Sequence, residues 1–312
     1  MNADKVSRVE GLASVRSLVG KPGSRFVRKL SGHVARILVV LLVGGFLGAT
    51  LVRLAPGYGT DQEELDSRLS AASIQALRQA RGADEGLASF YAHTLERLMR
   101  GDLGESETLG EPVRQLLAER SPETLESVGL GLAVGWIAGV ALAMAVVMSR
   151  RGIADVAAGL LASILLCVPA AVLALLFVIV QAPGRLVIGL IVFPNIYHYA
   201  RNLLARAAAL PHVLTARAKG VGSARVLLRH ILPVAAPQLL ALGGVSVSMA
   251  FAAAIPVEVL CDLPGIGQLA WKAAMGRDLA LLVDLTMIVT LITLVANTAA
   301  DLMAQPRPAG EA

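Results

Sequence analysis

The sequence predicts an all-helical membrane protein that crosses the bilayer six times. Of its 312 residues, 55% are hydrophobic and only 16% are charged, which lies outside the range of soluble domains. Six apolar runs of about 20 residues follow one another, and this is the length that a hydrocarbon core of about 30 Å requires of a spanning helix. The stretch from Val156 to Val257 contains no Asp or Glu, so it lacks the mixed charges of a soluble surface.

The six runs differ in strength. The fourth is the weakest, because it contains Pro194 and a polar patch at Asn195–His198. Gly and Pro inside the other runs do not argue against them, since spanning helices tolerate both. The first run follows a long basic leader without a clear cleavage site, so we interpret it as a retained helix and not as a signal peptide. The expected spans are residues 35–54, 124–148, 154–180, 185–204, 235–259 and 280–304.

Short basic loops predict the orientation. Arg150 and Arg151 separate the second and third spans, and the loop 206–233 between the fourth and fifth carries no acid. Short basic loops face the cytoplasm. We therefore expect a basic cytoplasmic tail at 1–34, a transmembrane domain at 35–306 and a cytoplasmic tail at 307–312.

The long segment 55–123 then faces outward, despite its arginines, because long loops cross largely regardless of charge. Leucines at helical spacing predict short amphipathic helices over 62–80 and 86–100 in this segment.

The sequence shows no chemistry of an enzyme. It contains no Walker phosphate loop, no nucleophile with a neighbouring base, and no metal-ligand spacing around Cys167 or Cys261. We predict no catalytic, cofactor-binding or metal-binding residue in this chain, and we expect any ATP that drives the protein to be bound by another chain. Nucleic acid is excluded as a partner because the basic residues lie in short loops between apolar runs.

The stretch TARAKGVGSARVLLRHILP, residues 215–233, interrupts the apolar runs with five basic side chains. It predicts a helix over 208–219, a break at Gly220-Val221-Gly222, and a second helix over 224–232 that Ser223 caps and Pro233 ends. The cationic face would carry Arg225 and Arg229, and the apolar face Val221, Leu228 and Leu232. The residues alone leave two interpretations open: a hairpin attracted to anionic lipid, or a two-sided knob that docks a protein.

A resemblance favours the docking knob. Gly220, nine residues and then His230-Ile231-Leu232-Pro233 resemble the Gly-to-Leu-Pro signature of ABC importer permeases, and the whole stretch is similar to their dipeptide, oligopeptide and nickel branch. The likeness continues along the chain in family order. It includes Arg53–Gly57, Arg100–Gly104, Ser106, Pro112-Val113, Pro122, Thr124–Glu126, Val257-Glu258, Pro264–Gly267 and Arg277-Asp278.

The resemblance implies a type I ABC importer permease in a bacterial or archaeal cell membrane. Such a permease pairs with a second homologous permease and two ABC ATPase subunits that bind ATP and Mg, and an extracytoplasmic binding protein delivers the substrate, here a peptide, a related small solute or nickel. The implied coupling helix is made by Thr215, Ala216, Arg217, Ala218, Lys219, Gly220, Arg225, Arg229, His230, Leu232 and Pro233. The implied outer-turn motif is made by Glu258, Pro264, Gly265, Gly267 and Asp278.

The chain also departs from the family. Leu214 stands where other importer branches have the Glu of a Glu-Ala-Ala motif, Tyr58-Gly59 replaces Asp-Pro, and Leu263 replaces an aromatic residue. The altered fourth span keeps open a degenerate, non-transporting scaffold. An ion-driven secondary transporter is the other alternative, although the centres of spans one to five carry no acid.

Polar residues inside the spans are the candidates for the substrate path. Asn195, Tyr197 and His198 leave two interpretations open: they line the path, because a polar patch beside a proline in a span often borders a cavity, or they form hydrogen bonds between helices. For Ser246, Ser248 and Asn297 we expect hydrogen bonds between helices instead.

Overall fold

The computed structural model describes residues 32, 35–48, 50, 87–149 and 152–304. The chain divides into two compact units, residues 1–43 and 44–312. In the first unit, the described residues 32 and 35–43 are helical. The expected tails at 1–34 and 307–312, the helix at 62–80, the Arg53–Gly57 motif and Arg150-Arg151 lie wholly or largely outside the described residues.

The described chain is helical apart from its turns and one isolated β-bridge between Glu105 and Pro112. A helix over Ala35–Gly48 covers most of the expected first span. The named helices follow it in the order α4 (Leu87–Met99), α5 (Val113–Ser149), α6 (Gly152–Cys167), α7 (Ala170–Ile179), α8 (Arg185–Ala208), α9 (Pro211–Ala218), α10 (Ser223–Val226), the π-helical turn η1 (Leu227–Ile231), α11 (Leu232–Leu260), α12 (Ile266–Met275) and α13 (Leu279–Ala304).

Three described segments are long and apolar enough to cross a membrane: Val113–Ser149, Ser223–Leu260 and Leu279–Ala304. The pair α6 and α7 makes a fourth if it counts as one span, and it is bent by 93°. The sequence expectation of one continuous helix over 154–180 is therefore wrong. Pro169 explains the break, because it lacks an N–H and takes an extended ψ of 140° just before α7.

The start of the second span differs from the prediction, whereas the end of the last span agrees with it. Helix α5 begins at Val113 and runs through Pro122, whereas the sequence predicted a start near 124. The fully buried Val113 packs with Leu116 against α12 and α13, so tertiary packing extends the helix beyond its apolar run. Helix α13 ends at Ala304, as expected.

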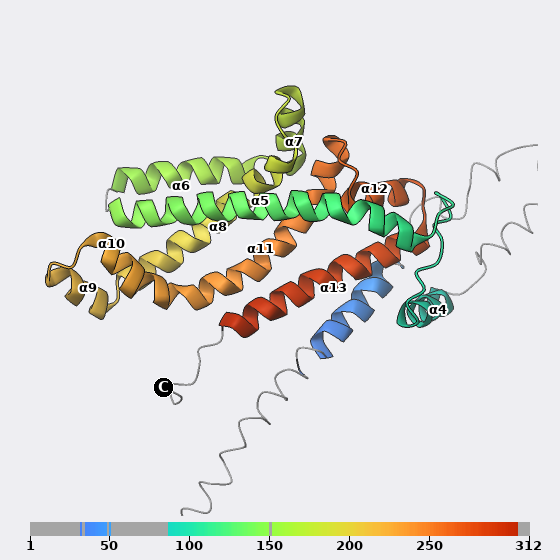
Figure 1. Cartoon of the computed structure of the whole chain (residues 1–312), viewed down its shortest axis with the longest axis horizontal. Helices are drawn as coiled ribbons and strands as arrows, with labels where there is room; N and C mark the ends of the chain where they lie inside the picture. Colours follow the sequence, from blue (N-terminus) through green and yellow to red (C-terminus); the bar gives the residue numbers. More distant parts are fainter. Residues whose placement is uncertain (1–31, 33–34, 49, 51–86, 150–151, 305–312) are drawn as a thin grey trace, which may run out of the picture. The chain divides into compact units, whose positions relative to one another are not determined.

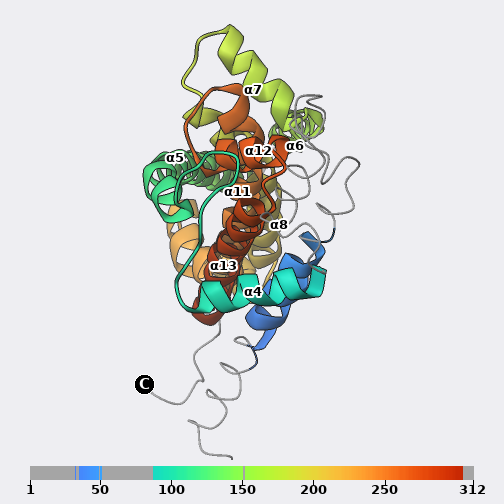
Figure 2. The same cartoon turned by 90° about the vertical axis from the view of Figure 1, so that its right-hand side faces the viewer.

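The long helices of the second unit connect two ends (Figures 1 and 2). At one end, which we call the outer end, Ser106 donates a hydrogen bond of 2.6 Å to Asp278, and Arg185 at the start of α8 pairs with Glu123 of α5. At the other end lies the segment Pro211–Ile231, which we call the elbow. Helix α8 runs from the outer end to the elbow, and α11 runs back from the elbow to the outer end.

Helices α5 and α8 pack closely through glycines. Gly131, Gly135 and Gly139 stand one turn apart on α5, and a Cβ added to Gly135 would lie 2.6 Å from the side chain of Val192 on α8. Small residues at this spacing let two helix backbones approach, which is a common way of packing helices in membranes.

Candidate functional site

The elbow begins with α9, which ends in a left-handed glycine. Gly220 has a φ of +77°. Its N–H donates to the carbonyl of Arg217 at 2.9 Å, and the N–H of Val221 donates to that of Ala216 at 3.2 Å. These two bonds form a Schellman motif, in which a residue with positive φ ends a helix and satisfies its last carbonyls. The break predicted at Gly220 is confirmed, and its geometry favours glycine.

The second half of the elbow differs from the expectation. Ser223 is the first residue of α10, and Gly222 is the N-cap, with no side-chain hydrogen bond. Pro233 does not end the helix, because it lies in the first turn of α11, where a missing N–H costs little. The π-helical turn η1 joins α10 to α11 directly, so this half of the elbow is the beginning of a long helix over Ser223–Leu260.

The elbow is anchored on one side and exposed on the other. Val226, Leu227 and Ile231 are buried in a cluster with the ends of α5 and α8. Arg225, Arg229, Leu214 and Leu228 are exposed, the two leucines by 51% and 59%. The predicted grouping of Leu228 with Val221 and Leu232 on one apolar face is wrong, because Val221 and Leu232 pack against the core cluster while Leu228 faces outward.

The other predicted coupling residues occupy three kinds of position. Thr215, Ala218 and Lys219 are exposed, Ala216 is buried, and Arg217 is half-buried. The ring of the half-buried His230 lies 6.4 Å from that of His212 on α9. The structure thus brings the predicted set together in one hairpin, with only part of it on the exposed face.

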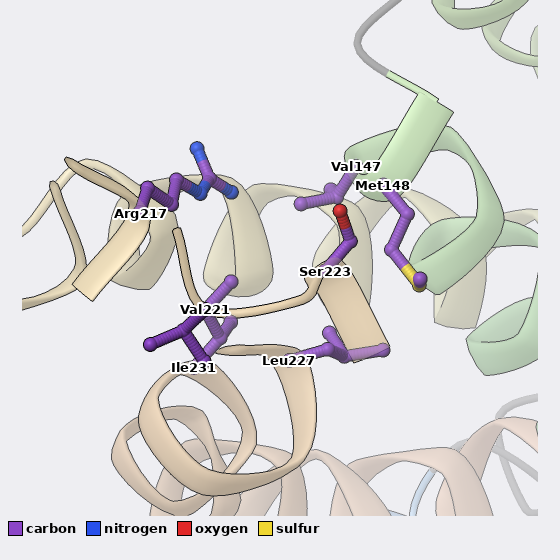
Figure 3. A pocket seen from close by; sticks show the side chains of 7 residues that line it. All are labelled: Val147, Met148, Arg217, Val221, Ser223, Leu227 and Ile231. Atoms are coloured by element: carbon purple, nitrogen blue, oxygen red, sulfur yellow. The ribbon is translucent and has the colours of Figure 1, made fainter. Parts of the chain in front are cut away.

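Two cavities lie behind the elbow. One, of about 160 Å³, is lined by Val147 and Met148 of α5 and by elbow residues that include Arg217 and Ser223 (Figure 3). The other, of about 400 Å³, lies between the ends of α5, α6, α8 and α9 and is also lined by Arg217. Asp155 and Arg201 border the larger cavity and form an ion pair with each other.

At the outer end, Glu258 holds three elements together. Its fully buried carboxylate accepts hydrogen bonds from the Thr124 hydroxyl at 2.8 Å and from the N–H groups of Gly267 and Gln268 at 2.7 and 3.3 Å. Thr124 in turn accepts the N–H of Ile266 at 2.7 Å. Glu258 of α11 and Thr124 of α5 therefore cap the first turn of α12, whose N–H groups have no partner within the helix.

The glycines of Pro264-Gly265-Ile266-Gly267 make room for this carboxylate. A Cβ on Gly265 would collide with the Glu258 carboxylate, and one on Gly267 would lie 2.8 Å from Cα of Ile255. Neither glycine has a positive φ, so close approach is what requires them. Next to this turn, burial raises the pKa of the Cys261 thiol.

Asp278 makes a second cap at the same end. Its buried carboxylate accepts hydrogen bonds from Ser106, from the N–H of Thr108 at 3.2 Å and from the N–H of Leu281 in the first turn of α13 at 2.9 Å. The segment before α5 is thereby tied to the start of α13. The predicted outer-turn residues form two neighbouring capping sites, and their role in the described structure is to join helices.

The predicted substrate-path residues lie on α8. Tyr197 is 1% exposed and stacks on Phe193 at 6.3 Å, and its hydroxyl has no hydrogen-bond partner among the described residues. Asn195 and His198 are half-buried, and His198 lies 3.5 Å from the hydroxyl of Ser163 on α6. None of the three lines either cavity behind the elbow, so their role in the path stays a prediction.

Comparison with known proteins assigns the chain to a family. The sequence model of the binding-protein-dependent transport system inner membrane component matches residues 131–305, which is more than half of the chain. The chain belongs to this family. The resemblance seen in the elbow and outer-turn motifs is confirmed, and the permease is a multi-pass membrane component of such a transport system.

The names of the relatives mention several different substrates. The permease is 27% identical to a Brucella ovis protein provisionally named as a peptide permease, over 85% of this chain and 92% of the relative. It is 26% identical to the glutathione transport system permease GsiC of Pectobacterium atrosepticum (89% and 95%) and 22% identical to the nickel import system permease NikB of Staphylococcus aureus (89% of each).

The fold is shared with a solved structure. A chain of the MetNI methionine ABC transporter, in inward-facing conformations, matches with a TM-score of 0.55 at 17% identity, over 61% of this permease and 95% of that chain. At this identity the likeness concerns the fold alone.

Sequence reasoning missed several residues that organise the permease. The stripe Gly131, Gly135 and Gly139 was readable as small residues every fourth position. The ion pair of Arg185 with Glu123 gave no signal, because its partners are far apart in sequence. The interhelical hydrogen bonds expected for Ser246, Ser248 and Asn297 are confirmed: Trp136 donates to Ser246 at 2.8 Å, and Asn297 donates to Ser248 at 3.0 Å.

Proposed function

We propose that this permease is the membrane-spanning subunit of an ATP-driven importer. It forms the translocation path with a second homologous permease and receives substrate from an extracytoplasmic binding protein. Two separate ATPase subunits bind ATP and Mg, and the elbow docks on one of them. The family assignment and the fold shared with a chain of an ABC transporter support this proposal.

The geometry of the elbow carries the proposal. Its buried residues anchor it to the ends of α5 and α8, and its Schellman motif fixes the angle between α9 and α10. Its exposed face presents Leu228 beside Arg225 and Arg229. A rigid knob that continues into α11 can pass a displacement of its partner to the outer end, where Glu258 joins α11 to α12. Alternating access then follows as a shift between two packings of the helices.

The proposed topology has six spans with both termini and the elbow in the cytoplasm. Helix α8 contributes one span despite its polar residues, because its 24 residues extend over about 36 Å. The bent pair α6 and α7 contributes another. Peptides, glutathione and nickel appear in the names of the relatives, and we propose a substrate of this range: a peptide, a related small solute or nickel.

Cross-linking in membranes of the native host tests the docking. A photo-reactive residue in place of Leu228 should trap a polypeptide that contains a Walker phosphate loop. The matched control is Leu160 on α6, which is exposed by the same 59% and should trap no such chain.

The glycine hinge gives the second arm of this test. Gly220→Leu should abolish the Leu228 cross-link and substrate-stimulated ATP turnover while leaving the chain inserted, because a side chain at φ +77° costs about 1 kcal/mol or more and turns the exposed face. Gly222→Ala is the control, since φ there is −57° and an added Cβ meets nothing within 4 Å. An unchanged cross-link and normal transport in Gly220→Leu would refute the docking proposal.

A further inference from the structure

Arg217 occupies a different position from the other arginines of the elbow. Arg225 and Arg229 are exposed, whereas Arg217 is half-buried and lines both cavities behind the elbow. In Figure 3 its side chain extends from α9 at one edge of the smaller cavity, and Val147 and Ser223 lie at the opposite edge. Its guanidinium therefore faces the space between the elbow and the end of α5.

This guanidinium has no counter-ion in the part of the chain that the structure describes. Its side chain forms no hydrogen bond or ion pair with a described residue, and the acid that borders the larger cavity, Asp155, is held by Arg201 through both carboxylate oxygens. Partly burying a cation without a partner costs free energy. An anion that enters the cavity would remove this cost.

The remaining wall is apolar. Val146 and Val147 of α5 and Leu214 of α9 line the larger cavity, together with alanines of α8. The cavity lies where α5 ends and α6 begins, which is the cytoplasmic membrane surface in the proposed topology. A ligand that fits carries one anionic group for Arg217 and a hydrocarbon chain for this wall. A phospholipid with a net negative headgroup has both.

We propose that the larger of the two cavities behind the elbow binds one anionic phospholipid from the cytoplasmic leaflet. Its phosphate lies against Arg217, and its acyl chain follows Val146, Val147 and Leu214. The lipid fills the gap between α9 and the ends of α5 and α6, and so fixes the elbow in its docking position. This inference rests on the proposed orientation of the permease.

Native mass spectrometry of the purified permease, released from nanodiscs of equal parts phosphatidylglycerol and phosphatidylcholine, tests the proposal. The wild type should retain one phosphatidylglycerol in preference to phosphatidylcholine. Arg217→Gln should lower this preference about fivefold, in line with about 1 kcal/mol for a basic residue at the membrane surface, and Arg217→Lys should restore most of it. Arg206→Gln, an exposed arginine at the end of α8, should leave it unchanged.

Two results would overturn the site. An equal loss of preference in Arg206→Gln and Arg217→Gln would mean that diffuse charge attracts the lipid, and an unchanged preference in Arg217→Gln would exclude Arg217. A free phosphate is distinguished by adding inorganic phosphate in large excess over the lipid: displacement of the lipid would assign the site to the free anion. Because retention is measured without the ATPase, failure here leaves the docking proposal standing, and failure of the Leu228 cross-link leaves the lipid site standing.

Discussion

Glu258 shows how one buried side chain can organise the outer end. Its carboxylate reaches α5 through Thr124 and α12 through two backbone N–H groups. A buried carboxylate is costly unless its oxygens are hydrogen-bonded, and here the first turn of α12 supplies the donors. The residue therefore stabilises the turn only while the glycines of the motif let the backbone come close.

Gly265→Ala should destabilise the permease more than any exposed alanine substitution. The new Cβ would collide with the Glu258 carboxylate, and either the side chain or the turn must move, at a cost of about 1–3 kcal/mol for overpacking. Thermal unfolding in detergent should show a lower midpoint. Gly129→Ala is the control, because a Cβ there meets nothing within 4 Å and alanine favours a helix. Equal midpoints in the two variants would contradict the capping role of Glu258.

The motif at this site was visible in the sequence, and its chemistry was not. Pro264–Gly267 and Glu258 could be named from the resemblance, but the hydroxyl that completes the cap belongs to Thr124, 134 residues away from Glu258. A sequence pattern relates only residues that are close along the chain, so it cannot assign a contact between two helices. For the same reason Ser106 and Thr108 could not be assigned as partners of Asp278.

At the scale of elements, the close contact of α5 with α8 depends on glycine. Ile188, Val192 and Ile196 of α8 fill the spaces left by Gly131, Gly135 and Gly139. Between helices in a membrane, close packing replaces the hydrophobic effect as the main source of association. A larger residue in this stripe separates the helices, and because α8 leads into the elbow, the separation also displaces α9.

Gly135→Leu should therefore lower both stability and coupling. The added atoms would overlap Val192, whose Cγ2 lies only 2.6 Å from the position of a Cβ, at a cost of about 1–3 kcal/mol. Limited proteolysis should cleave the loop between α8 and α9 faster than in the wild type. Gly129→Leu places the same side chain on an open face of α5 and should leave the cleavage rate unchanged. Similar cleavage of both variants would argue against the glycine stripe as the determinant of packing.

The presence of the helices could be predicted from the sequence, but the positions where they begin, break and connect were predicted less well. Composition indicated the helices, and the glycine at 220 indicated the end of α9. Pro233 and Pro169 misled in opposite ways, because proline permits a helix in its first turn and opposes one elsewhere. The effect of a proline therefore depends on where its helix begins, and packing determines that position. The turn η1 and buried Ile231 start the helix before Pro233 and continue it into α11, whereas no helical residues join α6 to α7.

For the whole molecule, the contacts constrain the topology more than hydropathy does. The hydrogen bond from Ser106 to Asp278 places the starts of α5 and α13 at one end. The bond from Arg185 to Glu123 places the start of α8 at that end as well. Helix α11 then separates this end from the elbow. If α11 crosses the membrane, the loop before α5 and the elbow lie on opposite sides.

Cysteine labelling decides whether α6–α7 and α8 also cross. With Cys167 and Cys261 replaced by serine, single cysteines at Leu109, Pro183 and Lys219 report on the loop before α5, the loop before α8 and the elbow. A membrane-impermeant maleimide on intact cells should label the first two, and Lys219→Cys should react only after permeabilisation. A cysteine in the tail 306–312 should behave like that at Lys219. Labelling of Leu109→Cys without labelling of Pro183→Cys would mean that α6–α7 and α8 enter and leave on the cytoplasmic side, and the permease would then have four spans with a re-entrant hairpin in place of six.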